Sequence, residues 1–125
     1  MPITIEKHPA VALTLFKAIG EVPFSEQMDA LKLFYKDFPT KNVLWDFTKM
    51  EEVNISSDEV KDIIQYTKAH ADKRTEGRTA LVVDTELKYG LSRMASTLAE
   101  IEDTPWEIKV FENMDAAMAW ISEKP

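Results

Sequence analysis

Apolar and polar residues alternate in blocks along the chain, and the clearest block spans residues 77–94. Residues 80–83 form an unbroken apolar run, which is typical of a strand covered on both faces. Asp84 and Thr85 interrupt this run. Apolar residues then recur at helical spacing, at Leu87, Leu91, Met94, Leu98 and Ile101. A buried strand that leads directly into an amphipathic helix predicts an open α/β sheet.

The N-terminal part of the chain predicts a hairpin followed by a helix. Residues 3–5 and 11–16 are strand-like, and the His8-Pro9 turn between them favours antiparallel pairing. Ser25 is expected to cap the helix that follows. The expected apolar face of this helix consists of Met28, Leu31, Phe34 or Tyr35, and Phe38.

The middle of the chain predicts a strand at residues 42–47 and then a helix that opens with a capping box. Ser56 is the expected N-cap, and Glu59, three residues later, completes the box. This helix should run to about Arg74, with Gly77 available for a left-handed conformation after its end. Its expected inner face consists of Val60, Ile63, Ile64, Thr67 and Ala71.

The C-terminal part predicts one more strand and one more helix. The helix after Thr85 should end near Asp103, and residues 106–111 form the next strand. Asn113 is expected to cap a last helix at residues 114–122. The expected inward-facing residues of this helix are Ala117, Trp120 and Ile121.

The predicted order of elements is ββαβαβαβα, and we expect residues 1–125 to form one domain. Strands that alternate with helices require right-handed crossovers, so strands two to five should be parallel. The first strand should pair antiparallel at an edge of the sheet. The predicted fold class is therefore α/β, with a mostly parallel five-stranded sheet and an antiparallel N-terminal edge hairpin.

The charge balance disfavours two classes of partner. The formal net charge is −7, because 22 acidic residues face 15 lysines and arginines. Binding of nucleic acid relies on basic side chains that neutralise phosphates, so we expect no nucleic-acid partner. An acidic surface also disfavours docking on anionic membranes. The negative net charge is explained by the need to keep a small domain soluble.

The composition indicates a soluble cytoplasmic protein. There is no cysteine, which is compatible with a reducing compartment and excludes thiol chemistry. The first residues show no basic segment followed by a long apolar run, so we expect no signal peptide. The apolar runs are too short to span a bilayer, and we expect no stable membrane insertion.

Motifs of catalysis and cofactor binding are missing from the sequence. No serine lies in a G-x-S-x-G elbow, and three glycines in all leave no phosphate-binding loop. His8 and His70 are far apart and lack the spacing of metal ligands. We therefore predict a protein that is not an enzyme and holds no cofactor and no metal.

Four segments, residues 43–47, 56–59, 79–94 and 110–121, carry a resemblance to a known family over nearly the whole chain. In their order and amino-acid sequence, these segments resemble the SpoIIAA-like family, a branch of the STAS-like domains found mainly in bacteria. The resemblance implies a STAS-like α/β fold, and its motifs concern packing rather than chemistry. The pattern of strands and helices is also similar to that of lipid-binding Sec14-type proteins.

Ser56 and Ser57 are candidate sites of a phospho-switch. The anti-sigma-factor antagonists that the family resembles carry a phosphorylatable serine at the start of a helix, and these two serines fall at the corresponding place. A helix N-terminus accommodates a phosphate, whereas Asp58 and Glu59 would repel it. Ser56 is also the expected N-cap. Plain capping and a phospho-switch are therefore both open.

The carboxyl ends of the parallel strands select a second group of candidates, because ligands bind at this edge of open α/β sheets. Asp46 and Thr48 follow one strand, and Asp84 and Thr85 follow the next. Asp84 and Thr85 are also explained as the N-cap of the helix behind them. Asp46 lies in an apolar strand, so it must be paired, exposed at the strand end, or functional.

Tyr89 and Arg93 complete the candidate residues for a ligand or partner. They lie about one helical turn apart and can face one cleft. Gly90 beside them is unfavourable in a helix, which predicts that another helix, a subunit or a ligand approaches its backbone closely.

Two functions from different classes fit these observations. The first is a non-catalytic regulatory or protein-interaction domain, because folding signals are complete and chemical motifs are missing. The alternative is a small carrier of an apolar ligand or lipid, based on the Sec14-like pattern and an aromatic-rich first helix. A homodimer is a further expectation, because the edge hairpin exposes backbone groups that a second chain can pair with.

Overall fold

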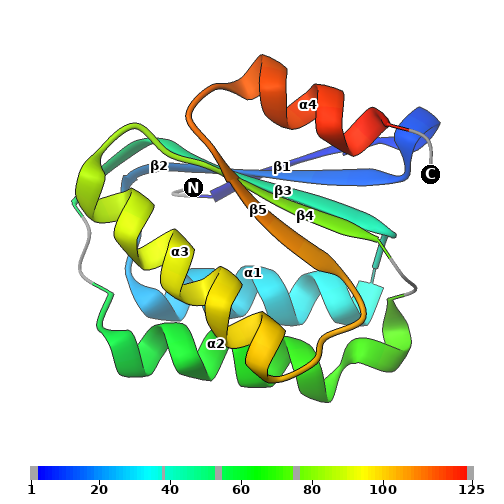
Figure 1. The fold of residues 1–125 in the computed structure, drawn as a ribbon, viewed down its shortest axis with the longest axis horizontal. Coiled ribbons are helices and arrows are strands. Elements are labelled where there is room, and N and C mark those ends of the chain that lie inside the picture. The colour runs from blue at the N-terminus through cyan, green and yellow to red at the C-terminus, as the bar shows by residue number, and fades with distance from the viewer. Residues whose placement is uncertain (1–2, 38, 53–54, 75–76, 124–125) are drawn as a thin grey trace.

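A computed structural model describes residues 3–37, 39–52, 55–74 and 77–123. Its five strands form one sheet in the order β1-β2-β3-β4-β5 (Figure 1). β1 pairs antiparallel with β2, and the other neighbouring pairs are parallel, as predicted. The strands are β1 (Ile3–His8), β2 (Leu13–Glu21), β3 (Asn42–Glu52), β4 (Arg78–Val82) and β5 (Glu107–Phe111).

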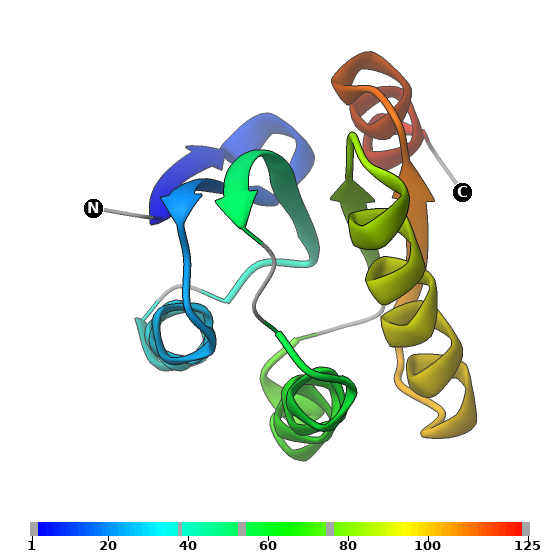
Figure 2. The same ribbon diagram turned by 90° about the vertical axis from the view of Figure 1, so that its left-hand side faces the viewer.

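Four helices cover the sheet, three on one face and one on the other (Figures 1 and 2). The three-helix layer consists of α1 (Phe24–Asp37), α2 (Ser57–Ala69) and α3 (Glu86–Ile101). Right-handed crossovers between strands that follow one another in order place all three on the same side. The other face is covered by α4 (Met114–Ser122), and two short 3-10 helices are at Pro9–Val11 and Ala71–Lys73.

Alternation along β3 divides the core between the two faces of the sheet. Val43 and Trp45 face the three-helix layer, where they join the larger apolar cluster. Leu44 faces α4 and packs with the buried Trp120 and Ile121. The predicted inner face of the last helix is therefore confirmed.

Strand and helix ends differ from the prediction at several places. β2 and β3 continue beyond the predicted strands and stay paired as far as Glu21 and Glu52. α1 begins at Phe24, so Ser25 lies inside its first turn and is not the N-cap. The carbonyl oxygen of Pro23 accepts hydrogen bonds from the amides of Glu26 and Gln27. Phe38, expected on the apolar face of α1, lies outside the described residues.

The end of α2 also differs from the prediction. The helix ends at Ala69 with His70 as its C-cap, and a 3-10 helix follows before Arg74. Gly77 does not adopt a left-handed conformation. A Cβ atom at Gly77 would collide with the carbonyl oxygen of Lys41, so glycine is required there for space rather than for helix capping.

The predicted apolar side of α3 was wrong at its two ends, whereas Leu91, Met94 and Leu98 between them are half-buried. The fully buried residues are Lys88, Ser92 and Ala99, whereas Leu87 is 61% exposed and Ile101 is 71% exposed. The buried line is displaced by one residue, which is about 100° around a helix. α3 packs against α2 as well as against β5, and these two contacts together set its rotation.

Candidate functional site

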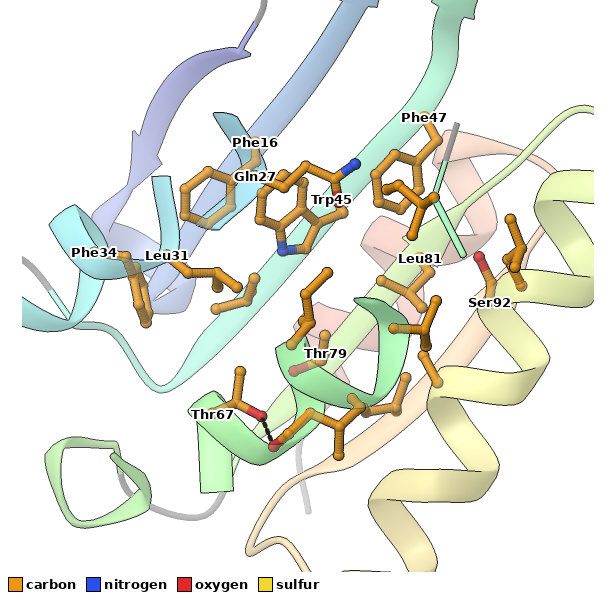
Figure 3. Close-up of a pocket in the computed structure, with 18 of the residues that line it drawn as sticks. Phe16, Gln27, Leu31, Phe34, Trp45, Phe47, Thr67, Thr79, Leu81 and Ser92 are labelled. Atoms are coloured by element: carbon orange, nitrogen blue, oxygen red, sulfur yellow. Dashed lines mark hydrogen bonds between the residues drawn. The ribbon is translucent and has the colours of Figure 1, made fainter. Parts of the chain in front are cut away.

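An apolar cavity of about 130 Å³ lies between the sheet and the three-helix layer (Figure 3). β3 and β4 form its floor, because alternate residues of a strand point to the same face. α1, α2 and α3 supply its other walls. Representative lining residues are Phe16, Leu31, Phe34, Trp45, Ile64 and Leu81.

Stacked aromatic rings form one wall of the cavity. Phe16 and Trp45, which face each other in the register of β2 and β3, stack with centroids 4.3 Å apart and planes 12° apart. Phe47 continues the stack, with its centroid 5.7 Å from that of Trp45. Phe34 meets Phe16 edge-on at 5.8 Å. Such contacts stabilise rigid side chains beyond the effect of burial, so this wall is preformed.

Gln27 is a polar residue in this apolar lining. Its side chain comes from the start of α1 and is only 4% exposed. In the described part of the chain, its Nε2 atom is the one buried side-chain nitrogen or oxygen without a hydrogen-bond partner. Buried polar groups are normally paired, so an unpaired amide in a cavity wall calls for an explanation.

Arg74 is a buried cation that also lines the cavity. It is 5% exposed, and it donates to the carbonyl oxygens of Lys41 (3.1 Å) and Arg78 (3.0 Å) and to Thr79 Oγ1 (2.8 Å). Among the described residues it makes no ion pair with a carboxylate. Burial lowers the pKa of Arg74 to about 10, against the opposing effect of Tyr35, so the guanidinium stays charged at neutral pH.

α3 contributes two further polar residues to the cavity wall. Lys88 is buried along its stem, and its Nζ atom lies 2.7 Å from Asp84 Oδ1. Ser92 is buried one turn later, on the cavity side of the helix (Figure 3). The three-helix side of the sheet therefore combines aromatic walls with a few polar groups, an arrangement typical of small-molecule sites.

Asp46 and Thr48 lie at an irregularity of the sheet. The register of β2 and β3 shifts between Lys17 and Ile19, and there the N–H and the hydroxyl of Thr48 donate to Asp46 Oδ1 at 2.9 and 2.7 Å. Asp46 follows Trp45 in the strand and so points away from the cavity. Pairing within a β-bulge accounts for a carboxylate in this strand.

Asp84 and Thr85 lie at the start of α3, as predicted. Thr85 is the N-cap, and its hydroxyl accepts from the Lys88 amide at 3.3 Å. Asp84 reaches the same residue through the ion pair of its carboxylate. These two residues therefore fix the first turn of α3 and with it the buried stem of Lys88.

Ser56 and Ser57 lie at the start of α2 and are exposed. Ser56 is the N-cap of a complete capping box: its hydroxyl accepts from the Glu59 amide at 3.2 Å, and its amide donates to Glu59 Oε1 at 2.9 Å. Ser57 is the first residue of the helix. Capping at Ser56 is thus present, and the phospho-switch stays a prediction.

Tyr89 and Arg93 line a groove between α3 and β5 and are not among the residues that line the apolar cavity. Gly90 beside them is exposed, and a Cβ atom there would meet no described atom within 4 Å. The prediction that another helix of this chain approaches Gly90 is therefore wrong. The candidate residues predicted from the sequence do not lie together in one site. Of these candidates, Asp84 and Thr85 contact the cavity-lining residue Lys88.

Gln27, Arg74 and Ser92 escaped the sequence analysis, and for Lys88 the sequence indicated a place near the start of a helix but not its burial. For Gln27 a signal existed, because it precedes Leu31 by four residues and Phe34 by seven and so lies on the apolar face of α1. The burial of Lys88 and Ser92 depends on the rotation of α3 about its axis, which the sequence pattern did not predict. The sequence predicts a helix as far as about Arg74, whereas in the structure Arg74 begins the connection to β4.

No group of three metal-ligating side chains occurs within the described ranges. Within the same ranges, none of the helices combines the length and the apolar character that crossing a bilayer requires.

The fold and the cavity define a class of protein, an α/β domain with a mostly parallel sheet and an apolar site under a layer of three helices. A model of the family described as SpoIIAA-like matches residues 11–122, and the chain belongs to this family. A solved structure of an uncharacterized protein with a SpoIIAA-like fold from Shewanella loihica PV-4 is similar, with a TM-score of 0.59 and 23% identity. The likeness covers 95% of this chain and 91% of that chain, and it concerns the fold. The chain matches no curated protein.

Proposed function

We propose that this protein is a non-catalytic binding domain that takes up a small apolar molecule between the sheet and helices α1 to α3. The observation that carries the proposal is the aromatic-lined cavity of about 130 Å³. An apolar cavity of about 150 Å³ in another protein stays dry and binds benzene. A cavity of nearly this size therefore suits a single ring or a short alkyl chain.

The volume limits the class of ligand. Sites for drug-sized molecules measure about 300–1,000 Å³. The cavity as it stands is smaller, so a compact apolar molecule fits and a long lipid chain does not. Of the two ligand classes predicted for a carrier, an apolar ligand or a lipid, the cavity volume therefore favours a small apolar ligand.

Ala95 offers a direct test, because it lies on α3 and lines the cavity. Ala95→Leu should fill the cavity and abolish binding of toluene and other single-ring compounds, measured by NMR titration. Ala116→Leu, at an exposed position of α4, is the matched control and should bind like the wild type. Native mass spectrometry of protein from its host would reveal a retained ligand. A clean apo mass together with no binding of single-ring compounds contradicts the proposal.

A second function, docking of a protein partner, is supported by the outer side of α3. Leu87 and Ile101 are strongly exposed and lie on the same side of this helix, since they are fourteen positions apart. A regulatory partner or a second copy of the chain would cover them. The doubly substituted variant Leu87→Ser, Ile101→Ser should keep its melting temperature and lose self-association or partner binding in sedimentation experiments. Unchanged sedimentation in the presence of the partner would contradict this role.

A cytoplasmic location and a homodimer belong to the same set of proposals. The cysteine-free composition supports the first. The open backbone edge of β1 supports the second. Light scattering at high micromolar concentration distinguishes a monomer from a dimer.

A further inference from the structure

Gln27 combines deep burial with an unused hydrogen-bond donor. Its side chain runs past Trp45 toward Phe47 along the aromatic wall (Figure 3). The Nε2 atom is shielded from solvent and has no partner among the described residues. Leaving such a donor unpaired destabilises the folded protein, and an apolar residue of similar size would avoid this penalty.

Three other polar residues of the cavity wall, Thr67, Thr79 and Lys88, already have partners in the chain. The hydroxyl of Thr67 donates to the Ile64 carbonyl oxygen at 2.8 Å. The hydroxyl of Thr79 accepts from Arg74, and the Lys88 ammonium pairs with Asp84. The Gln27 amide therefore differs from these three residues, because its donor has no partner among the described residues.

We propose that the ligand of this cavity is a neutral apolar molecule with one acceptor oxygen, such as a ketone or an ester, which accepts a hydrogen bond from Gln27 Nε2. This inference rests on the proposed function, since it requires an occupied cavity. A neutral carbonyl oxygen matches a neutral amide donor. A carboxylate placed against the Gln27 amide would be a buried charge beside a neutral group, and a buried charge without a charged partner is costly.

Two probes of the same shape test the inference. Acetophenone and cumene have the same arrangement of heavy atoms, and a carbonyl oxygen in the first replaces a methyl group in the second. Both are titrated into the wild-type protein, into Gln27→Leu, and into Gln65→Leu as a control for an exposed glutamine on α2. Calorimetry gives the dissociation constants, and ¹⁵N NMR follows the side-chain amide of Gln27.

The expected result is selective for the carbonyl oxygen. Gln27→Leu should weaken binding of acetophenone about fivefold relative to cumene, the effect of one neutral hydrogen bond. Only acetophenone should shift the Gln27 amide signals downfield, and Gln65→Leu should leave the ratio of the two constants unchanged. Without ligand, Gln27→Leu should melt at a higher temperature than the wild type, which a purely structural glutamine would not allow.

Several results would overturn the inference. Equal changes for both probes in Gln27→Leu, or tighter binding of benzoate than of acetophenone to the wild type, exclude the proposed hydrogen bond to a neutral oxygen. If neither probe binds the wild type, the proposed function itself fails, and the inference fails with it. Should Gln27→Leu not fold, Gln27→Met and the wild-type amide shifts decide the question.

Discussion

The guanidinium of Arg74 lies over the indole ring of Trp106, with Cζ 4.5 Å from the ring centroid. Both residues are buried and both line the apolar cavity. The same guanidinium binds the backbone before β3 and at the start of β4, while Trp106 immediately precedes β5. One side chain therefore joins three neighbouring strands where they begin, and it closes one side of the cavity.

Arg74→Lys should lower the free energy of unfolding by about 2–4 kcal/mol, because lysine cannot donate to three acceptors in the fixed geometry of a guanidinium. Denaturant unfolding measures this change. Arg93→Lys, at an exposed position of α3, is the matched control and should change stability by less than about 0.5 kcal/mol. Similar losses in both variants would show that Arg74 does not join the strands.

Tyr35 should make the stability sensitive to alkaline pH. Burial raises the pKa of its phenol above the ordinary 10.0, and Arg74 partly opposes this shift. The neutral phenol is therefore favoured in the folded state, so its contribution is complete below about pH 10 and is lost as the pH rises through the folded-state pKa. Above about pH 10, the wild type should therefore lose stability more steeply than Tyr35→Phe.

Denaturant unfolding at several pH values measures this difference. Arg74 acts in the opposite direction, because its lowered pKa means that the penalty for burying its charge is relieved above about pH 10. It is present in both proteins, so the comparison reports mainly on the phenol. Parallel pH profiles of the two proteins would contradict the expected role of Tyr35.

Gly90 and Gly77 should respond to alanine in opposite directions. At Gly90, in the helix α3, a Cβ atom meets open space, so Gly90→Ala should stabilise by about 0.5–1 kcal/mol. At Gly77 the same change forces the Lys41 carbonyl oxygen to move, and Gly77→Ala should destabilise by about 1–3 kcal/mol. Thermal unfolding measures both. A dimer that dissociates in Gly90→Ala would instead place a second subunit at this helix.

Ser56 and Ser57 separate capping from regulation. Ser56→Ala should cost about 1 kcal/mol, whereas Ser56→Asp, itself a good N-cap, should keep the melting temperature. If Ser56 only caps α2, Ser56→Asp should also keep every interaction with a partner protein. A phospho-switch requires that Ser56→Asp or Ser57→Asp abolishes binding of a partner while the fold stays intact. Protein from its native host that carries no phosphoserine in any growth phase would exclude the switch.

Local signals in the sequence predicted the elements that depend on neighbouring residues. The capping box of Ser56 and Glu59 and the caps Thr85 and Asn113 involve contacts within one helical turn, so spacing alone identifies them. The rotation of α3 depends on α2 and β5, which are distant in sequence. A pattern of Leu87, Leu91 and Met94 therefore indicated a helix but placed its buried side about one residue away from the observed one.

The candidate site was less accessible to sequence analysis than the fold. Phe34 and Trp45 are apolar whether they fill a core or line a cavity, so their type does not distinguish the two. Gln27 differs, since a polar residue on the apolar face of α1 was visible from its spacing to Leu31. Its lack of a hydrogen-bond partner emerges only when the surrounding side chains are placed.

The order of the strands has a consequence for how the chain reaches its fold. Because neighbouring strands in the sheet are also successive along the chain, each new strand adds to one already formed, and the sheet can grow during synthesis. The face under α4 behaves differently. Leu15 and Leu44 stay exposed to water until residues 114–122 have been synthesised. This face of the sheet is therefore the apolar surface of the nascent chain that a chaperone would have to shield.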